Sequence, residues 1–564
     1  MKKTEGKPLP FGDTIQKDKV NFAVPVPEGK EAALLLYRVG EETPCMSWPL
    51  EDSVGEVRCL ALEGCDPAEY EYNYEIDGEI VPDAYARAYA GKEVWGKETK
   101  ASDHTLRCKL YDEPYDWEGD KQLHIPYHKV IAYALHVRGF TQDASSKVAH
   151  RGTFQGIVEK LPYIKELGVN QIQCMPVYEF EECTESHLNY WGYGKAYYFA
   201  PKSAYAADGN GIKGLKDMVK ACHKEGIEVV LEMPFSSEVP GQVIGECLRY
   251  YMMEYHIDGF ILNPMLISIE SVSADPILKT TKIIQHREDF QGTMRRFLKG
   301  DEGMMEAVTY WLRHLSEEDH IFNYITSHTG FTLKDLVSYD EKHNEENGEN
   351  NQDGPDYNNS WNCGIEGPTR KKSILSLRKT QMKNAFFLLL LSQGTPCILA
   401  GDEFGNSQKG NNNVYCQDNA VSWLNWSQLS KEKELHDFVK VLIALRKEYP
   451  LLYPEKEMTG ADRTGRGVPD VSYHGEEAWR APFERTSRQL GVYYSAATRE
   501  EEECFIAYNM HWTKHDFALP ILSKGKNWYL RASTQDGVLT EPSLLKEQKK
   551  VELPPRTVMF ITGR

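Results

Sequence analysis

Polar side chains stand at the ends of several apolar segments, and these residues are the best placed to do chemistry. Glu232 lies near the end of IEVVLEM, Asn263 follows DGFIL, His286 follows TKIIQ, and His328 ends FNYITSH. If such segments are the parallel strands of a barrel, the side chains at their carboxyl ends share one face. A carboxylate can act there as a nucleophile, and a histidine can act as an acid because its pKa lies near neutrality. The neutral amide of Asn263 can form no covalent ester.

The segments between these residues alternate between strands and amphipathic helices. The helix predicted for IVEKLPYIKELGV ends at Gly168, and its apolar face consists of Ile157, Leu161, Ile164 and Leu167. The helix predicted for GLKDMVKACHKEG has a similar face, made of Leu215, Met218, Val219 and Cys222. VIAYALHV, NQIQCMPV and PCILAGDE are further candidate strands. Repeated strand–helix units indicate a parallel sheet with buried strands and predict a (β/α)8 barrel.

The sequences on both sides of this region lack its alternation of strands and helices. Short β-rich runs separated by Gly, Pro and acidic turns predict an N-terminal β-sandwich over 1–118. The helical period stops after LIALRKEYP, and β-rich runs such as QLGVYYS and RTVMFITG predict a C-terminal β-sandwich domain over 453–564. The fold class predicted is therefore α/β: a (β/α)8 TIM barrel over 119–452 between two β-domains.

One segment fits neither strands nor helices. Residues 341–364 are polar and rich in Asn and Gly, which predicts a long loop, and Trp361 and Cys363 at its end favour an ordered one. Its ENNQDG stretch resembles half of a calcium loop, but the position that needs a bidentate Glu holds Ser360. We therefore expect no calcium there.

The composition excludes several classes of partner. A net charge of −19 argues against nucleic acid and anionic membranes, and favours a neutral ligand. The start of the chain carries no apolar stretch of a secretory signal, and AFFLLLL at 385–391 is too short to span a bilayer. The 12 cysteines include no CxxC pair. We expect a cytoplasmic protein with reduced thiols, no metal site and no cofactor.

Several motifs in order along the chain resemble those of one known family. YALHVRGFT, NYWGYGKAYYFAP, the loop KHNEENGENNQDG…NNSWNCGIEG and GDEFGNSQKGNNNVYCQDN are similar to the isoamylase and glycogen-debranching branch of the alpha-amylase superfamily (glycoside hydrolase family 13). The resemblance covers nearly the whole chain, and the first domain resembles a glycogen-binding module. It implies a barrel enzyme that cleaves α-1,6 branch points with two carboxyl groups roughly 5–5.5 Å apart.

Compared with the pattern of that family, the catalytic positions of this chain are changed. Where the family has an Asp at the end of the third strand, this chain has Glu232. Where the family then has an Asn-His pair, this chain has Ser236 and Ser237. The remaining changes replace the arginine, the nucleophilic Asp, the acid Glu and the stabilising Asp, and the residues found are Ile261, Asn263, His286 and Thr329. The loss of both arginine and Asp is coherent, because an unpaired buried cation would be costly. The inherited mechanism is therefore expected to be absent.

Other residues could have taken over the chemistry. Glu232 is the fallback carboxylate, and Glu238, Glu288 and Asp289 lie on neighbouring loops. A rewired glycoside hydrolase acting on α-1,6 or α-1,4 bonds is therefore the alternative hypothesis. A serine hydrolase using Ser236 or Ser237 is less favoured, because no G-x-S-x-G elbow surrounds them.

Some positions of the family's sugar site are retained. The resemblance makes Tyr193 the aromatic platform for a glucose ring and His328 a hydrogen-bond donor to its hydroxyls, and it also retains Asn189 and Trp191. Asp402 and Glu403 are expected to orient loops instead. The predicted function is a glucan-binding or regulatory homologue of debranching enzymes, with α-glucan (glycogen or maltooligosaccharide) as partner. An active debranching homologue is a second possible partner.

Overall fold

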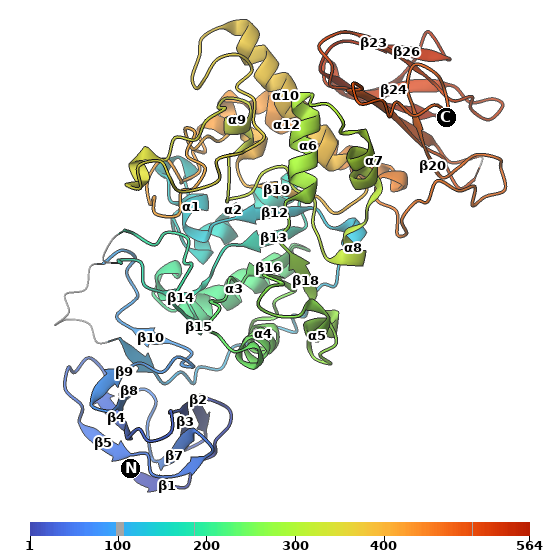
Figure 1. Ribbon diagram of the computed structural model, residues 1–564. Helices are drawn as coiled ribbons and strands as arrows, with labels where there is room; N and C mark the ends of the chain where they lie inside the picture. Colours follow the sequence, from blue (N-terminus) through green and yellow to red (C-terminus); the bar gives the residue numbers. More distant parts are fainter. Residues whose placement is uncertain (98–105, 185–186, 499) are drawn as a thin grey trace. The chain divides into compact units, whose positions relative to one another are not determined.

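The computed structural model describes residues 1–97, 106–184, 187–498 and 500–564 (Figure 1). The chain divides into two compact units. Unit 1 consists of Met1–Leu123, His136–Leu161 and Cys174–Ile283, and unit 2 of His124–Leu135, Pro162–Gln173 and Ile284–Arg564. Both units therefore contain segments of the predicted barrel, and the three domain boundaries set from the sequence stay a prediction.

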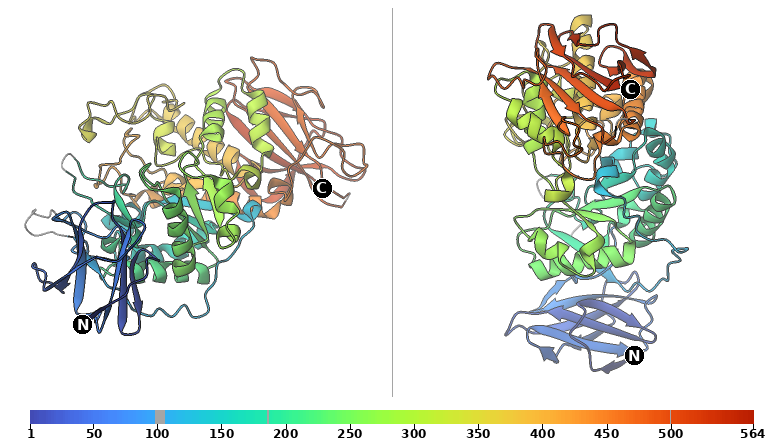
Figure 2. Two further views of the ribbon diagram at one scale, coloured as in Figure 1. Left: turned by 60° about the horizontal axis from the view of Figure 1, so that its bottom comes forward. Right: turned by 90° about the vertical axis from the view of Figure 1, so that its right-hand side faces the viewer.

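Unit 1 begins with the predicted β-sandwich. One sheet has the order β1 (Lys2–Thr4), β7 (Val57–Glu63), β3 (Lys19–Pro25), β2 (Gly12–Gln16), with β6 (Ser53–Val54) on β7. The other has the order β10 (Tyr89–Ala90), β11 (Arg107–Lys109), β8 (Tyr70–Ile76), β4 (Ala32–Arg38), β5 (Met46–Pro49), with β9 (Glu79–Val81) on β8. Figure 2 shows the two sheets face to face, and Phe22, Leu36, Leu60 and Tyr72 fill the core between them.

The barrel segments of unit 1 are parallel strands that alternate with helices. β16 (Glu228–Glu232) pairs in parallel with β17 (Gly259–Leu262), and Glu232 lies opposite Ile261. The helices are α1 (Val137–Thr141), α3 (Gly211–Lys224), α4 (Gly241–Tyr255) and α5 (Ile269–Ser273). All four residues of the predicted apolar face of α3 are fully buried, which confirms that prediction. An antiparallel hairpin, β14 (Tyr178–Phe180) and β15 (Ala196–Pro201), frames the loop that carries Tyr193.

Three elements have residues in both units: α2 (Phe154–Leu167), β13 (Gln171–Cys174) and β18 (Lys282–Gln285). The sequence predicted all three. Ile157 and Ile164 on the apolar face of α2 are fully buried, and Gly168 ends the helix with a φ of 98°.

In unit 2, β12 (Ala132–Leu135) pairs in parallel with β19 (Cys397–Leu399). The predicted strand FNYITSH is wrong as a continuous strand, because the structure has only isolated parallel bridges there, Gln285 to Ile321 and Asn323 to Pro396. Across the second bridge, the N–H of Asn323 donates to the carbonyl of Thr395 (2.8 Å), and the N–H of Cys397 donates to the carbonyl of Asn323 (2.7 Å). The helices of this unit are α6 (Asp289–Lys299), α7 (Met305–Arg313), α8 (Ser316–Asp319), α9 (Leu333–Leu336), α10 (Lys372–Leu390), α11 (Gln428–Lys431) and α12 (Lys433–Glu448).

Unit 2 ends in a β-domain. Its main sheet has the order β20 (Val471–His474), β21 (Gln489–Tyr494), β22 (Glu503–Asn509), β27 (Thr557–Gly563), β24 (Trp528–Ser533), β25 (Gly537–Leu544). A second pair consists of β23 (His515–Ala518) and β26 (Lys550–Leu553). Phe505, Phe517, Trp528 and Ile561 belong to the core of this domain. The β-rich runs of the sequence predicted this region correctly.

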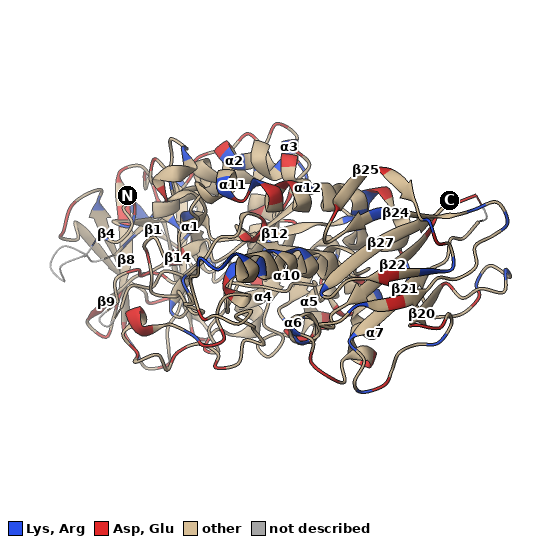
Figure 3. Ribbon diagram, turned by 90° about the horizontal axis from the view of Figure 1, so that it is seen from above, with Lys and Arg blue, Asp and Glu red and all other residues tan. Residues whose placement is uncertain are grey.

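Basic and acidic residues are mixed along α12, which Figure 3 shows, whereas the charged residues of α10 are all basic. Ion pairs such as Lys383–Glu434 (2.7 Å) and the i,i+4 pair Lys433–Asp437 connect them. Such interspersed charges are typical of a solvated surface and contribute little stability individually. No helix among the described residues is long and apolar enough to cross a membrane.

Candidate functional site

Glu232 lies where the sequence predicted it, at the carboxyl end of a barrel strand. It is the last residue of β16, and its Oε1 accepts a hydrogen bond from the phenol of Tyr193. Burial and the neighbouring Glu232 carboxylate raise the pKa of Tyr193 well above its usual value. The phenol therefore stays protonated over the physiological pH range and acts as a donor. The structure thus brings together the fallback carboxylate and the predicted sugar platform.

The loop that presents Tyr193 is held by its own hydrogen bonds. Asn189 donates from Nδ2 to the carbonyl of Tyr193 (3.0 Å), and its Oδ1 accepts the N–H of Gly192 (2.9 Å). Gly192 has a φ of +80°, and a Cβ there would lie 2.4 Å from the ring of Phe180. The side chain of Asn189 therefore shapes this turn, which is the reason for an asparagine and a glycine at these positions.

Trp191 and His136 contact the same loop. Trp191 is 5% exposed, and its ring centroid lies 5.6 Å from that of Tyr193. His136 donates from Nε2 to the carbonyl of Tyr190 (2.9 Å), and its Nδ1 accepts the N–H of Gly139 (3.0 Å). Sequence reasoning did not select His136, although it lies within the quoted motif YALHVRGFT.

Ile261 on β17 and Asn263, the residue after this strand, make ordinary local contacts. Ile261 lies opposite Glu232 in the parallel ladder, and its carbonyl accepts the N–H of Met233 (3.0 Å). Asn263 is exposed, and its Oδ1 accepts the N–H of Met265 (3.0 Å), two residues further along the chain. An asparagine in such a turn satisfies the backbone locally.

The serines after β16 also make local contacts. The N–H of Ser236 donates to the phenol oxygen of Tyr198 (2.9 Å), and the Ser236 Oγ accepts the N–H of Glu238 (3.3 Å). Ser237 and Glu238 are exposed. A hydroxyl that accepts a backbone N–H in a turn serves loop geometry, and this arrangement gives the serine-hydrolase hypothesis no base to activate the oxygen.

In unit 2, His286 lies directly after β18 and stacks on an aromatic ring. The ring centroids of His286 and Tyr324 are 4.9 Å apart with an interplanar angle of 24°, and the Tyr324 hydroxyl lies 3.5 Å from Nδ1. The rings of His286 and His328 have centroids 6.1 Å apart. The structure therefore brings the two predicted histidines together. Tyr324 was not selected from the sequence, because its alternation in FNYITSH resembles that of any strand.

Burial determines the charge state of His328. It lowers the pKa of the imidazole to about 4, so this side chain is neutral at physiological pH and can both donate and accept a hydrogen bond. The hydroxyl of Thr329 lies 3.1 Å from that of Ser327. Neither residue carries the negative charge that a developing oxocarbenium ion needs.

The remaining acids near these histidines are solvated or paired. Glu288 and Asp289 are exposed at the start of α6, and the Asp289 carboxylate forms an ion pair with Arg287 (3.0 Å).

The guanidinium of Arg295, in α6, is buried and donates to the backbone carbonyls of Ile325 (2.6 Å) and Asn358 (3.0 Å). Burial lowers the pKa of Arg295 to about 10.

Asp402 and Glu403 are buried and fully engaged by the scaffold. Asp402 accepts the N–H of Leu333 (2.8 Å) and the hydroxyl of Thr326, and burial raises its pKa to about 7. Glu403 accepts the phenols of Tyr133 (2.7 Å) and Tyr163 (2.6 Å). These contacts agree with the predicted role in orienting loops.

The Asn-rich loop over 341–364 is an ordered hydrogen-bonded network. Asn344 and Asn412 are fully buried and exchange two hydrogen bonds, from Asn344 Nδ2 to Asn412 Oδ1 (2.8 Å) and from Asn412 N to Asn344 Oδ1 (3.0 Å). Asn412 Nδ2 also donates to the carbonyl of Pro355 (2.8 Å) and to Asn358 Oδ1 (3.0 Å). The predicted order of this loop is confirmed.

Comparison with known proteins places the chain in a family. The model of the alpha-amylase catalytic domain matches residues 125–236. Chloroplastic isoamylase 1 of Arabidopsis thaliana is 30% identical over 90% of this chain and 82% of its own length. The glycogen operon protein GlgX homolog of Mycobacterium tuberculosis is 28% identical over 99% of this chain and 96% of its own length. The chain belongs to the isoamylase family.

Solved structures support the fold of this isoamylase-family chain. A pullulanase from Bacillus acidopullulyticus superposes with a TM-score of 0.74 at 19% identity, over 98% of this chain and 75% of its own. The catalytic module of SpuA, described as a glycogen-degrading pneumococcal virulence factor, gives a TM-score of 0.76 at 17% identity, over 99% and 97% of the two chains. The predicted fold, a TIM barrel of the alpha-amylase type flanked by β-domains, is confirmed.

The residues selected from the sequence offer little acid–base chemistry. Among Glu232, Asn263, His286 and Thr329, only Glu232 has a carboxyl group. Glycoside hydrolysis needs two carboxyl groups, one as nucleophile or base and one as acid. Within the described parts of the chain, no cluster of His, Cys, Asp or Glu is arranged to hold a metal ion.

Proposed function

We propose that this isoamylase-family chain binds α-glucan without cleaving it, as a non-catalytic or regulatory homologue of debranching enzymes. The observation that carries this proposal is the state of Glu232, the single acid at the catalytic positions, whose carboxylate accepts the phenol of Tyr193. A lone carboxylate cannot both attack the anomeric carbon and protonate the leaving oxygen in one step. General acid catalysis alone contributes about 10²–10⁴-fold, and it is lost together with the nucleophile.

Binding needs only the groups that are retained. The half-buried ring of Tyr193 offers an apolar face to a pyranose ring, and its orientation is set by the turn around Asn189 and Gly192. The neutral imidazole of His328 suits a sugar hydroxyl, because it needs no counter-charge. In this proposal Asn189 and Trp191 act by holding the platform in place.

Affinity electrophoresis in glycogen-containing gels tests the binding function. The natural protein is expected to be retarded by glycogen, and Tyr193→Ala to lose at least about half of that retardation. Tyr357→Ala is the matched control, since Tyr357 is 91% exposed in the Asn-rich loop. Equal retardation of the natural protein, the variant and the control would contradict the role of Tyr193. A natural protein that glycogen does not retard would contradict glucan binding.

A rewired hydrolase is the second candidate, and the position of Glu232 at a strand end favours it. In such an enzyme Glu232 would be one of the two required carboxyl groups. Release of reducing sugar that Glu232→Gln abolishes, and Glu238→Gln preserves, would identify it.

Partnership with an active debranching homologue would be a regulatory form of the same function. Co-purification of such a homologue with the tagged chain, together with a change in its rate on glycogen, would establish it. An unchanged rate at saturating amounts of the chain would contradict regulation.

A further inference from the structure

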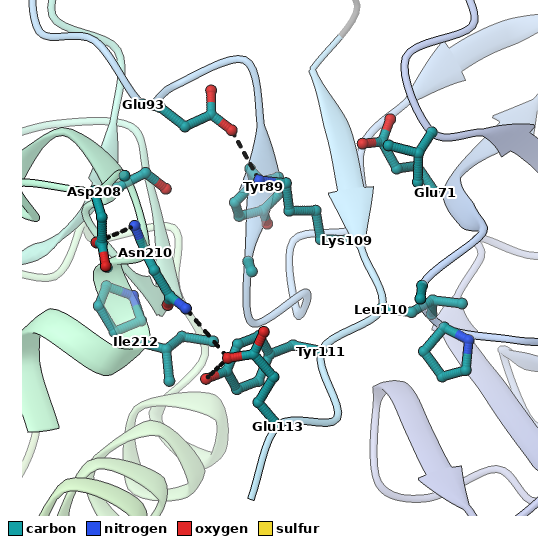
Figure 4. Close-up of a pocket in the computed structure, with 18 of the residues that line it drawn as sticks. Glu71, Tyr89, Glu93, Lys109, Leu110, Tyr111, Glu113, Asp208, Asn210 and Ile212 are labelled. Carbon is teal, nitrogen blue, oxygen red and sulfur yellow. Dashed lines mark hydrogen bonds and ion pairs between the residues drawn. The ribbon is translucent and has the colours of Figure 1, made fainter. Parts of the chain in front are cut away.

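Unit 1 contains a pocket that none of the catalytic positions touches. It has a volume of about 290 Å³ and lies between the strand end of β11, the segment that follows it, and the start of α3 (Figure 4). Glu71 on β8 and Lys109 on β11 line one side, and Asp208 and Asn210 before α3 line the other. Because all of its walls belong to unit 1, the pocket is a feature of one compact body.

Glu71 is the unusual residue of this pocket. It is 5% exposed, and no hydrogen bond or ion pair reaches its carboxylate from the part of the chain that the structure describes. Lys109 is its cross-strand neighbour, but the Lys109 ammonium instead binds Glu93 at 2.8 Å. Burial raises the pKa of Glu71, while Lys109 and Arg107 act in the opposite direction. The Glu71 oxygens are not among the side-chain atoms that are sealed from solvent without a partner, so they are accessible from the pocket and can accept hydrogen bonds from the hydroxyls of a ligand.

Other polar groups surround the opening at fixed positions. Asn210 caps α3, because its Oδ1 accepts the N–H of Lys213 (3.1 Å), and its Nδ2 lies 3.4 Å from the Glu113 carboxylate. The N–H of Asn210 donates to Asp208 (3.0 Å), as Figure 4 shows. Such groups, fixed by secondary structure, can orient a ligand without reorganisation.

Charge narrows the class of ligand. The lining includes four carboxylates, on Glu71, Glu93, Glu113 and Asp208, against the single ammonium of Lys109, so an excess of three negative charges faces the pocket. This excess disfavours phosphorylated and carboxylated ligands. The described residues also hold no group arranged for a metal ion. What remains is a neutral molecule with several hydroxyl donors.

The floor of the pocket supplies the matching apolar surface. Tyr70, Tyr89, Leu110 and Ile212 are buried there, and Tyr111 is half-buried at the edge. Tyrosine rings with adjacent carboxylates suit sugars, which have apolar C–H faces and hydroxyl edges. A volume of about 290 Å³ lies at the low end of small-molecule sites, which is the size of a mono- or disaccharide.

We propose that this pocket binds a terminal glucosyl or maltosyl unit of an α-glucan, with the Glu71 carboxylate accepting sugar hydroxyls. The site is separate from the Tyr193 platform and would hold a second point of the same polysaccharide. The pocket as a neutral-sugar site rests on its own geometry, and the choice of glucose rests on the proposed function. Two attachment points on one chain raise avidity for a branched polymer.

The test uses the full chain with maltotriose as the probe. Isothermal titration measures the affinity, and hydrogen exchange measures the protection of the segments 107–113 and 208–213. Ala68→Trp fills the pocket from its exposed rim, and Glu71→Gln removes the charge at constant shape. Ala461→Trp is the matched control, because Ala461 is exposed in unit 2. Tyr193→Ala removes the other predicted site.

The natural protein is expected to show maltotriose-dependent protection of both segments, and either pocket variant to weaken that binding at least about tenfold. Tyr193→Ala and Ala461→Trp should leave the protection unchanged. Protection that persists in both pocket variants would overturn the proposal, as would its absence in the natural protein. Equal protection by lactose would overturn the assignment to α-glucan while supporting a sugar site. A third outcome separates the two proposals. If maltotriose protects both segments of the natural protein, but Tyr193→Ala does not reduce its retardation by glycogen, only the proposed role of Tyr193 is contradicted.

Discussion

The Asn-rich loop over 341–364 and the strand ends of the barrel differ in the burial of their polar side chains. In the loop, Asn344 is fully buried, and two hydrogen bonds join it to Asn412, a fully buried residue outside the loop. At the strand ends, Asn263 and His286 are exposed side chains. The buried amides of the loop therefore contribute to the stability of the fold, whereas the exposed side chains at the strand ends contribute little to it.

This difference separates two kinds of information in a family match. Residues that satisfy buried backbone and amide groups are constrained in any protein with this fold, active or not. Catalytic carboxylates are constrained only by the reaction, and their charges even destabilise the folded state when unpaired. Membership of the isoamylase family therefore establishes the architecture, and activity must be judged at the individual strand ends.

The largest effect is expected from the loop. Asn412→Ala removes the partner of Asn344, Asn358 and the carbonyl of Pro355, and these buried groups lose hydrogen bonds. Three buried groups at roughly 1–3 kcal/mol each give a loss of roughly 3–9 kcal/mol in the free energy of unfolding. Because Asn344 Nδ2 keeps the carbonyl of Asp353 as an acceptor (2.9 Å), we expect the lower part of this range, roughly 3–5 kcal/mol. Urea denaturation followed by tryptophan fluorescence measures this loss. Gln352→Ala, on an exposed residue of the same loop, should change stability by no more than about 0.5 kcal/mol.

A smaller effect is expected from the buried carboxylate of Asp402. Its folded-state pKa of about 7 exceeds the unfolded value, so the folded state binds more protons between the two values and stability falls as pH rises. Between pH 5 and pH 8 the loss should be about 3 kcal/mol at most, from 1.36 kcal/mol for each pKa unit. Asp402→Asn should flatten this part of the stability profile. An unchanged slope in the variant would show that Asp402 does not titrate in this range.

A third prediction separates the ring of Tyr193 from its hydroxyl. Tyr193→Ala removes the stacking surface and should weaken maltooligosaccharide binding at the barrel site about tenfold, which corresponds to about 1.4 kcal/mol. Tyr193→Phe keeps the ring and loses only the donor to Glu232, so the change should be about threefold or less. Measuring both by titration in an Ala68→Trp background isolates the barrel site. An equal loss in both variants would assign the affinity to the hydroxyl.

The smallest effect concerns pH. His328, with a pKa of about 4, stays neutral and Tyr193 stays protonated between about pH 5.5 and pH 8, so neither changes charge. Glucan affinity at the barrel site should therefore vary by less than about twofold over this range. A steeper profile that His328→Gln abolishes would show that the imidazole is charged in the complex.

The sequence was most informative where a pattern is local. The buried face of α2 and the end of that helix at Gly168 follow from spacing and from a glycine with positive φ. FNYITSH failed because the pairing of a strand depends on neighbours that are distant along the chain, and the structure has only isolated bridges at Ile321 and Asn323. The position of Glu232 at a strand end was predictable, but its contact with Tyr193 joins residues 39 apart along the chain. Glu71 carried no signal at all, since a missing partner is visible only in three dimensions.

Product analysis of branched limit dextrin, incubated with the natural protein at high concentration, tests the central claim most directly. A variant that restores the family's residues (Ile261→Arg, Asn263→Asp, His286→Glu, Thr329→Asp) and a Glu232→Gln variant would be run beside it. The account predicts that mass spectrometry detects no new linear maltooligosaccharide from the natural protein while the dextrin is still bound. Release at an ordinary enzymatic rate that Glu232→Gln abolishes would contradict it, because the chain would then be a working hydrolase with rewired carboxylates.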